Sequence, residues 1–264
     1  MADALIEELK DGLLTLTMNR PERRNAMSAE MMEGLLQAVS KAAANPDVGA
    51  VLLRGAGGTF CVGGDVKGMN ERSGGERPPV DQRAEELRRR MEVSRLLHDM
   101  RKPTVAAISG AAAGAGLSLA LACDIRVAGK SAKITTAFAK VGLSGDFGGT
   151  YFLTKLVGTS KARDLYFTSP ILTGEEAYAM GIVSRVVPDT EVDKVAQDIA
   201  VSLAKGPRVT LAYMKQNLNL AETMPLATVF DAEALQHSRC GDTEDHKEAA
   251  AAFVQKRQPV FKGR

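Results

Sequence analysis

The stretch KPTVAAISGAAAGAGLSLALACD, residues 102–124, decides the fold of this chain. It predicts a short buried strand over 105–108, a turn built only of small residues over 109–116, and an apolar helix directly afterwards. The first N–H groups of such a helix lack partners, so the turn favours an anion or a developing oxyanion. Its ligand is either a dinucleotide pyrophosphate or the oxygen of a reacting carbonyl. The turn contains three glycines, which let the backbone approach a ligand closely: Gly110, Gly114 and Gly116.

The composition excludes several classes of protein. The chain has 264 residues, 45% of them apolar, and can therefore bury one large core. Lys and Arg number 34 against 32 Asp and Glu, and this net charge of +2 gives no indication of nucleic acid or an anionic membrane as a partner. No apolar run reaches the length of about 18 residues that a membrane span needs, and the first residues do not resemble a signal peptide.

Cysteine and histidine usage argues against a disulfide framework and against a metal site. Cys61, Cys123 and Cys240 are odd in number and share no CxxC spacing. The three histidines lie far apart in the sequence. These features predict a soluble protein of a reducing compartment, the cytoplasm, with no bound metal.

Strands and helices alternate over about 190 residues, and an all-helical tail follows. Glycine-rich turns follow strands at 55–65, 109–116 and 141–150. The pattern predicts an α/β fold with a helical C-terminal segment. The predicted elements are a hairpin over 5–18, a helix over 28–44, a strand over 48–53, a polar loop over 70–82, a charged helix over 81–100, strands over 123–128 and 132–135, a helix over 173–180 that begins with a capping box, a last strand over 182–187, and four helices after Glu191.

A dinucleotide-binding fold is the first alternative for the central glycine turn. Residues 109–116 resemble the glycine motif of short-chain dehydrogenases, and Tyr151 with Lys155 supplies a YxxxK pair. In that family, however, the turn follows the first strand and the Tyr-Lys pair lies far downstream. Here the turn comes after about 100 residues, and no acidic residue at a strand end follows at the spacing that holds a ribose. The order of the motifs therefore disfavours an NAD-binding enzyme.

Two of the glycine turns together resemble the enoyl-CoA hydratase/isomerase (crotonase) superfamily. The resemblance rests on FCVGGDVKGM over 60–69 and on VAAISGAAAGAGLSLALACD over 105–124. It implies ββα units wound into a spiral that forms a core over 1–200. The C-terminal helical segment over 201–264 would then build a homotrimer, or a hexamer as a dimer of trimers. Supporting motifs occur in the family's order: NRP at 19–21, NAM at 25–27, GGT at 148–150, LTGEEA at 172–177 and FVQKRQPVFK at 253–262.

The resemblance implies an oxyanion hole for an acyl-CoA thioester, made by the backbone N–H groups of Gly64 and Ala115. Enolisation of a thioester places negative charge on its oxygen, and preorganised N–H donors stabilise that charge by several kcal/mol. No cofactor is implied beyond the coenzyme A of the substrate. Asp65 follows the turn glycines and is expected to cap nearby N–H groups rather than to act as an acid.

Two glutamates that activate water in the family's hydratases are missing here. One belongs four residues into the helix after the oxyanion glycines, where this chain has Ser118. The other belongs ten residues before the Gly-Gly-Thr turn, where this chain has Phe138. Neither residue can shuttle a proton at neutral pH, so the two-glutamate hydratase mechanism is not expected.

One carboxylate remains in a suitable place. Asp146 matches the aspartate of the Leu-x-x-Asp-x-Gly-Gly segment that several isomerases of the family carry. Its apolar neighbours predict a raised pKa and a role as proton shuttle, although a structural Asx turn is the alternative. The hypothesis is a Δ3-Δ2-enoyl-CoA isomerase, or a related ring-opening epoxyphenylacetyl-CoA isomerase. A hydratase with atypical catalytic residues and a non-catalytic acyl-CoA-binding protein remain as alternatives.

The resemblance also predicts which residues contact the acyl-CoA substrate. Cations should line the path of the CoA phosphates, and Arg23, Arg24 and Lys67 flank the first two motifs. Phe253 and Lys256 match a C-terminal pair that contacts CoA on a neighbouring subunit. The remaining predicted contacts lie around the oxyanion turns: Ala26, Val62, Asp65, Val66, Gly114, Ser118 and Phe138.

Overall fold

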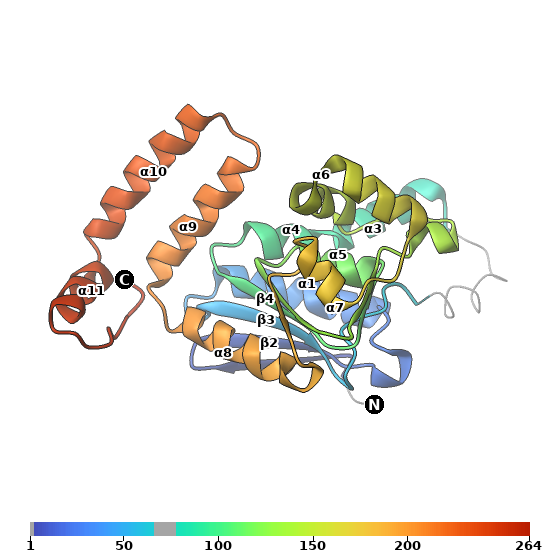
Figure 1. Ribbon diagram of the computed structural model, residues 1–264, viewed down its shortest axis with the longest axis horizontal. Helices are drawn as coiled ribbons and strands as arrows, with labels where there is room; N and C mark the ends of the chain where they lie inside the picture. The colour runs from blue at the N-terminus through green and yellow to red at the C-terminus, as the bar shows by residue number, and fades with distance from the viewer. Residues whose placement is uncertain (1–2, 66–77) are drawn as a thin grey trace.

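The computed structural model describes residues 3–65 and 78–264 as a mostly parallel sheet covered by helices (Figure 1). Its strands are β1 (Leu5–Lys10), β2 (Leu13–Met18), β3 (Ala50–Gly55), β4 (Thr104–Ile108), β6 (Ile125–Gly129) and β8 (Arg185–Val187), in that spatial order. Only β1 runs antiparallel to its neighbour, as the predicted hairpin requires. Two further strands, β5 (Ala111–Ala113) and β7 (Lys133–Thr135), pair in parallel beside this sheet.

The helices begin and end largely where their capping residues predict. Ser28 caps the first long helix by accepting a hydrogen bond from Met31 N, and Thr173 with Glu176 forms the predicted capping box. None of the described helices is long and apolar enough to cross a membrane. The helices are α1 (Ala29–Ala44), α3 (Val80–Arg90), α4 (Glu92–Asp99), α5 (Ala115–Leu121), α6 (Gly149–Thr168), α7 (Gly174–Ala179), α8 (Val192–Ala204), α9 (Arg208–Ala221), α10 (Leu226–Gly241) and α11 (Glu244–Val254), with 3-10 turns η1 (Pro21–Arg23), η2 (Phe138–Val141) and η3 (Asp189–Glu191).

Both faces of the sheet are buried, and alternation along the strands sorts side chains between two cores. In β3, Val51 and Leu53 join the larger core beneath α1, whereas Leu52 points to the opposite face. That opposite face is covered by α8, which packs alanines such as Ala196 and Ala200 against the strands. Figure 1 shows α8 on one side of β2, β3 and β4 and α1 on the other.

Two of the predicted elements were wrong in detail. The turn predicted over 109–116 contains the strand β5, because its alanines are small enough to lie against a neighbouring backbone segment. The charged helix predicted over 81–100 is two helices, α3 and α4. The break occurs because Ser94 N donates to Met91 O, three residues back, which tightens the turn.

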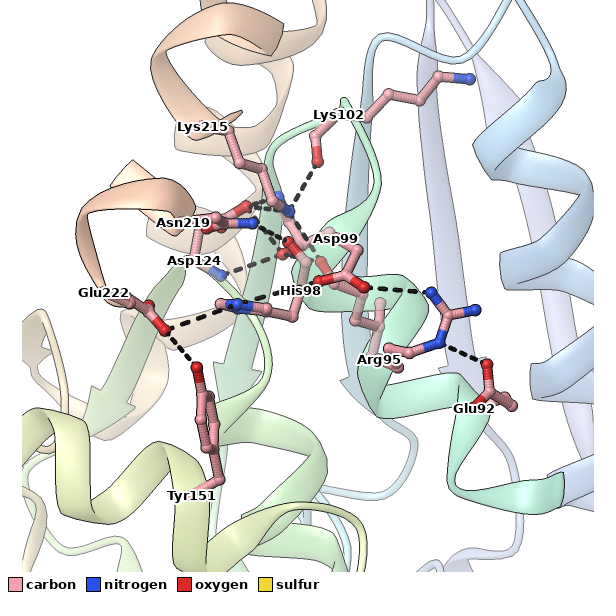
Figure 2. A network of polar contacts seen from close by, with 12 residues as sticks. Glu92, Arg95, His98, Asp99, Lys102, Asp124, Tyr151, Lys215, Asn219 and Glu222 are labelled. Carbon is pink, nitrogen blue, oxygen red and sulfur yellow. Dashed lines mark hydrogen bonds and ion pairs between the residues drawn. The ribbon is translucent and has the colours of Figure 1, made fainter. Parts of the chain in front are cut away.

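The C-terminal helices α9 to α11 extend away from the sheet (Figure 1). A buried lysine joins the first of them to the body of the molecule. Lys215 Nζ of α9 donates to Asp124 Oδ2 at 2.8 Å, to Leu97 O at 2.8 Å and to Lys102 O at 3.1 Å, as Figure 2 illustrates. Asp124 also accepts from the backbone N–H and the hydroxyl of Thr104. The ammonium group of Lys215 therefore joins α9 to three other parts of the chain: the end of α4, the turn before β4 and the residue before β6.

Lys215→Met is expected to lower the free energy of unfolding by about 3 kcal/mol, because it leaves a partly buried carboxylate and two carbonyls without their cation. Urea denaturation of the purified protein measures the change. Lys194→Met is the matched control, since Lys194 forms an exposed ion pair with Asp198 on α8 and should leave the stability unchanged. An equal effect of both substitutions would contradict the role given to Lys215.

Candidate active site

Two backbone segments converge where the sequence placed its first two glycine turns. Cys61 N donates to Ala111 O at 3.0 Å, and Ala113 N donates to Cys61 O at 3.0 Å. A Cβ on Gly116 would overlap Cys61 O, and one on Gly63 would lie 2.8 Å from Ala113 O. Glycine is therefore required at both positions because the two backbones touch.

The N–H groups at this junction that have no acceptor within residues 3–65 and 78–264 include those of Gly64 and Ala115. Ala115 is the first residue of α5, where intrahelical acceptors do not exist. Gly64 follows Gly63, whose carbonyl is held by Met27 N at 2.8 Å. The site of a Cβ on Gly63 lies 3.3 Å from Ala115 N, so the two segments are close at this point.

Buried polar groups hold in place the segment over 55–65, which carries Gly64. The amide of Asn25 donates to Ala56 O at 2.9 Å and to Thr59 O at 2.6 Å, and it is fully buried. The thiol of Cys61 donates to Asn25 O at 3.0 Å. Burial raises the pKa of Cys61 to about 12, so this residue remains a neutral hydrogen-bond donor.

The predicted proton shuttle, Asp146, lies in the loop between η2 and α6. Its Oδ1 is buried and has no hydrogen-bond partner in the described part of the chain. Burial raises the pKa of this carboxyl to about 6. The next residue, Phe147, has a left-handed backbone with φ of 50°, a strained conformation for a bulky residue. An Asx turn would pair the carboxylate with nearby N–H groups, so the geometry disfavours the structural alternative.

The positions of the missing glutamates lie beside this loop. Ser118 is buried on α5 and donates to Gly114 O at 3.3 Å. A Cβ on Gly149 would overlap Ser118 Oγ and lie 2.5 Å from the hydroxyl of Tyr166. Phe138 stacks on the Tyr166 ring with centroids 6.0 Å apart and an interplanar angle of 7°. The Asp146 loop, α5 and η2 therefore meet around one tyrosine.

Tyr166 is a site residue that the sequence analysis missed. Burial, with the charge of Asp146 as a smaller cause, raises its pKa, and a hydrogen bond with Ser118 opposes that shift. The phenol consequently stays protonated and acts as a donor. No sequence signal could have found it, because Tyr166 lies in the last turn of the long helix α6 with no motif around it.

A cavity of about 550 Å³ brings several predicted CoA contacts together with Gly64. Arg24, Ala26, Val62 and Asp65 all line it, and so does Arg23. Val66 and Lys67, which were predicted for the same site, lie outside the described residues, as does most of the loop predicted over 70–82.

Asp65 forms an ion pair that the sequence analysis did not foresee. Arg20 Nη2 approaches Asp65 Oδ2 at 3.3 Å, and Arg20 Nη1 donates to Ala26 O at 2.6 Å. This arginine belongs to the Asn-Arg-Pro motif, which was the available signal for it. The predicted capping of N–H groups by Asp65 remains a prediction.

Among the described residues, five other predicted contacts do not line this cavity: Gly114, Ser118 and Phe138 beside the oxyanion turn, and the C-terminal pair Phe253 and Lys256. Phe253 lies on α11 with 86% of its surface exposed, and Lys256 follows the end of that helix. Figure 1 shows α11 at the far end of the C-terminal segment, well away from α5. Within one chain, therefore, neither residue reaches Gly64 or Ala115.

Asp146→Asn is expected to stabilise the protein at pH 7. The folded-state pKa of about 6 lies above the ordinary value of 3.8, so burial of the charged form destabilises the native state increasingly as the pH rises from about 4 to about 6. The gain is at most about 3 kcal/mol at pH 7, and it vanishes below about pH 4. Urea denaturation at pH 4 and pH 7 measures it, and a variant less stable than the wild type at pH 7 would contradict the unpaired state of Asp146.

The architecture defines the class of the protein. A solved structure described as an enoyl-CoA hydratase/isomerase from Mycobacterium abscessus matches with a TM-score of 0.91 and 35% identity, over 99% of this chain and 100% of that one. A second, described as an enoyl-CoA hydratase from Streptomyces coelicolor A3(2), matches with a TM-score of 0.93 and 34% identity, over 99% and 94%. The α/β class with a helical C-terminal segment is confirmed, and the fold is that of the crotonases.

The sequence comparisons identify the family. The profile of the enoyl-CoA hydratase/isomerase family matches residues 8–264. The 1,2-epoxyphenylacetyl-CoA isomerase of Escherichia coli strain K12 is 36% identical over the whole of both chains. The short-chain-enoyl-CoA hydratase of Clostridium acetobutylicum is 31% identical over 96% of this chain and 95% of that one. The chain belongs to the enoyl-CoA hydratase/isomerase family of enzymes, as its two glycine turns indicate.

Proposed function

We propose that this enzyme is an enoyl-CoA isomerase that moves a double bond from the Δ3 to the Δ2 position of a thioester, or performs a closely related isomerisation. One observation carries the proposal. Asp146 is a partly buried carboxylate whose Oδ1 is buried without a hydrogen-bond partner in the described chain, and its pKa of about 6 suits a group that must both take and return a proton near neutral pH.

The reaction needs one base and one oxyanion site. Asp146 removes a proton from C2 of the acyl group, and the resulting negative charge moves to the thioester oxygen. The N–H groups of Gly64 and Ala115 stabilise this enolate by hydrogen bonds. The same carboxyl then returns the proton to C4, so the double bond becomes conjugated with the thioester and no atom is gained or lost.

The surroundings of Asp146 favour isomerisation over hydration. Hydration needs a group that activates water and a group that protonates carbon, and Ser118 and Phe138 supply neither. Tyr166 closes the space between them and, as a protonated phenol, cannot serve as a base at neutral pH. The isomerase name of the Escherichia coli relative supports the same choice, whereas relatives named hydratases keep hydration as the second candidate.

For the remainder of the substrate, we propose that the cavity beside Arg24, Ala26 and Val62 takes the CoA part. Arg23 and Arg24 supply positive charge there for its phosphates. Phe253 and Lys256 would reach this cavity from a neighbouring copy of the chain, which fits their distance from it in a single chain. No cofactor beyond CoA enters the proposal.

We propose, as the family resemblance implies, that the chain forms a homotrimer or a dimer of trimers, and the face of α9 and α10 has features that favour association. A groove of about 480 Å³ lies between these helices. Two side-chain oxygens that are buried without partners among the described residues, Asn217 Oδ1 and Gln236 Oε1, belong to residues lining it. Leu218 and Phe230 expose 70% and 57% of their surfaces. Apolar area of this kind favours association.

The free state of all three cysteines fits the proposed cytoplasmic location.

Ultraviolet absorbance of the conjugated thioester tests the proposed reaction. The purified protein is given a 3-enoyl-CoA and, separately, a 2-enoyl-CoA. We expect absorbance to rise with the first and to stay constant with the second. A fall with the second substrate would identify a hydratase instead. Binding of both thioesters with no change in either would identify a non-catalytic acyl-CoA-binding protein.

A further inference from the structure

A second cavity, of about 420 Å³, opens directly beside the Asp146 loop. It lies between α4, α6 and the end of α9. Phe147 and Gly148, the two residues that follow Asp146, form part of its wall, so the cavity begins directly beside the proposed base. The other described residues that matter for its chemistry are Met91, Ser94, His98, Tyr151 and Phe152.

Ser94 gives this cavity an unsatisfied hydroxyl. The residue is 2% exposed, and its Oγ has no hydrogen-bond partner in the described chain. A buried hydroxyl without a partner is unfavourable, and a serine within a helix commonly avoids this by bonding a carbonyl one turn back. Ser94 lies in the first turn of α4, just after the break at Met91, and its N–H donates to Met91 O. A ligand oxygen in the cavity would satisfy the hydroxyl.

The rest of the wall divides into an apolar part and a polar part. Met91, Phe147 and Phe152 supply apolar surface nearest the Asp146 loop. On the other side, His98 Nε2 lies 3.8 Å from Glu222 Oε2, and Tyr151 donates to the same carboxylate oxygen at 3.0 Å. Figure 2 shows these three side chains converging from α4, α6 and the end of α9.

The charges around the cavity disfavour an anionic ligand. The two arginines in its described wall are already paired: Arg88 with Glu92, and Arg95 with both Glu92 and Asp99. Glu222 adds a further negative charge beside His98. No cation remains unpaired in the described wall to balance a carboxylate, so the polar group that fits here is neutral.

We propose that this cavity receives the far end of the acyl group and selects acyl groups that carry a neutral oxygen, such as a hydroxyl or a ring oxygen, through a hydrogen bond to Ser94. The proposal rests on the acyl-CoA function above and adds a substrate class to it. The carbon part of the acyl group packs on Met91, Phe147 and Phe152, while the oxygen reaches Ser94.

Binding of saturated thioesters tests this selection without requiring any isomerisation. Each ω-hydroxyacyl-CoA, with acyl chains of about four to eight carbons, is paired with the acyl-CoA in which a methyl group replaces the hydroxyl. Calorimetry with the wild type is expected to give, at one chain length, a Kd about tenfold lower for the hydroxylated member. Ser94→Ala should abolish that preference and leave the Kd of the methyl member unchanged.

Thermal unfolding distinguishes a binding role of Ser94 from a merely structural one. Because the hydroxyl has no protein partner, Ser94→Ala should unfold at the same temperature as the wild type or a higher one. Ser202→Ala on α8, an exposed helical serine, is the control and should change neither property.

Two results would overturn the proposal: no chain length at which the hydroxylated member is preferred, or a preference that survives in Ser94→Ala. The isomerase function can fail independently of this. A protein that prefers the hydroxylated thioester but converts no 3-enoyl-CoA would retain this inference and lose the reaction. A protein that converts 3-enoyl-CoA with no preference would retain the reaction and lose this inference. If no thioester bound, both the proposed isomerase function and the proposed selection through Ser94 would be contradicted.

Discussion

Replacement of Asp146 by Asn is expected to lower kcat for isomerisation about a thousandfold, with little change in KM. The amide keeps the size and polarity of the side chain but cannot accept the proton from C2. The wild-type rate should also fall as the pH drops through about 6, since protonation of Asp146 removes the base. Steady-state kinetics with a 3-enoyl-CoA at several pH values measures both effects.

Asp164→Asn is the matched control for this substitution. Asp164 lies on α6, the helix that begins just after Asp146, but it is exposed and paired with Lys161. Its replacement should leave kcat unchanged within about twofold. If Asp146→Asn retained the wild-type rate and pH profile, another group would be the base and the proposed mechanism would be wrong.

Ala115→Pro is expected to lower kcat by about a hundredfold to a thousandfold, because proline removes the N–H that the mechanism assigns to the oxyanion. The position spares the backbone hydrogen bonds of the helix. Ala115 is the first residue of α5, where proline is tolerated and no intrahelical hydrogen bond is lost. The same reaction as above, together with circular dichroism and thermal unfolding, separates loss of the donor from loss of the fold.

Ala29→Pro provides the control for a proline at the start of a helix. Ala29 is the exposed first residue of α1, behind the cap at Ser28. This variant should keep both activity and stability. A folded Ala115→Pro protein with full activity would show that the N–H of Ala115 does not stabilise the reacting oxygen.

Much of the fold could be predicted because short-range sequence patterns determine where most strands and helices begin and end. Alternating apolar residues and turn glycines located most strands, and Ser28, Thr173 and the breaks at 206, 225 and 241 located helix ends. The order of the motifs along the chain was also sufficient to identify the family. The division into segments 1–200 and 201–264 remains a prediction, with residue 200 inside α8, which packs on the sheet.

The parts that could not be predicted depend on contacts between distant segments. Tyr166 meets Ser118 and Phe138 only because α6 folds back over α5 and η2. His98 and Glu222 are 124 positions apart and meet where α4 and α9 come together. The break at Met91 was missed because charged residues continue through it, so the periodicity carries no signal of the tightened turn.

The burial of Asp146 links stability to catalysis in this account. The same burial that raises its pKa also destabilises the folded protein at neutral pH. Asp146→Asn is accordingly expected to be both more stable and nearly inactive. Such opposite changes are typical of functional groups that a fold holds in an unfavourable environment.

Label transfer during isomerisation tests the central claim, a single base that moves one proton, most directly. A 3-enoyl-CoA with deuterium at both C2 positions is converted in ordinary water, and the label is located in the product at early conversion. The account predicts deuterium at C4, carried there by Asp146 from C2. Product with only solvent hydrogen at C4, even in the first turnovers, would contradict it, because a second group or water would then deliver the proton.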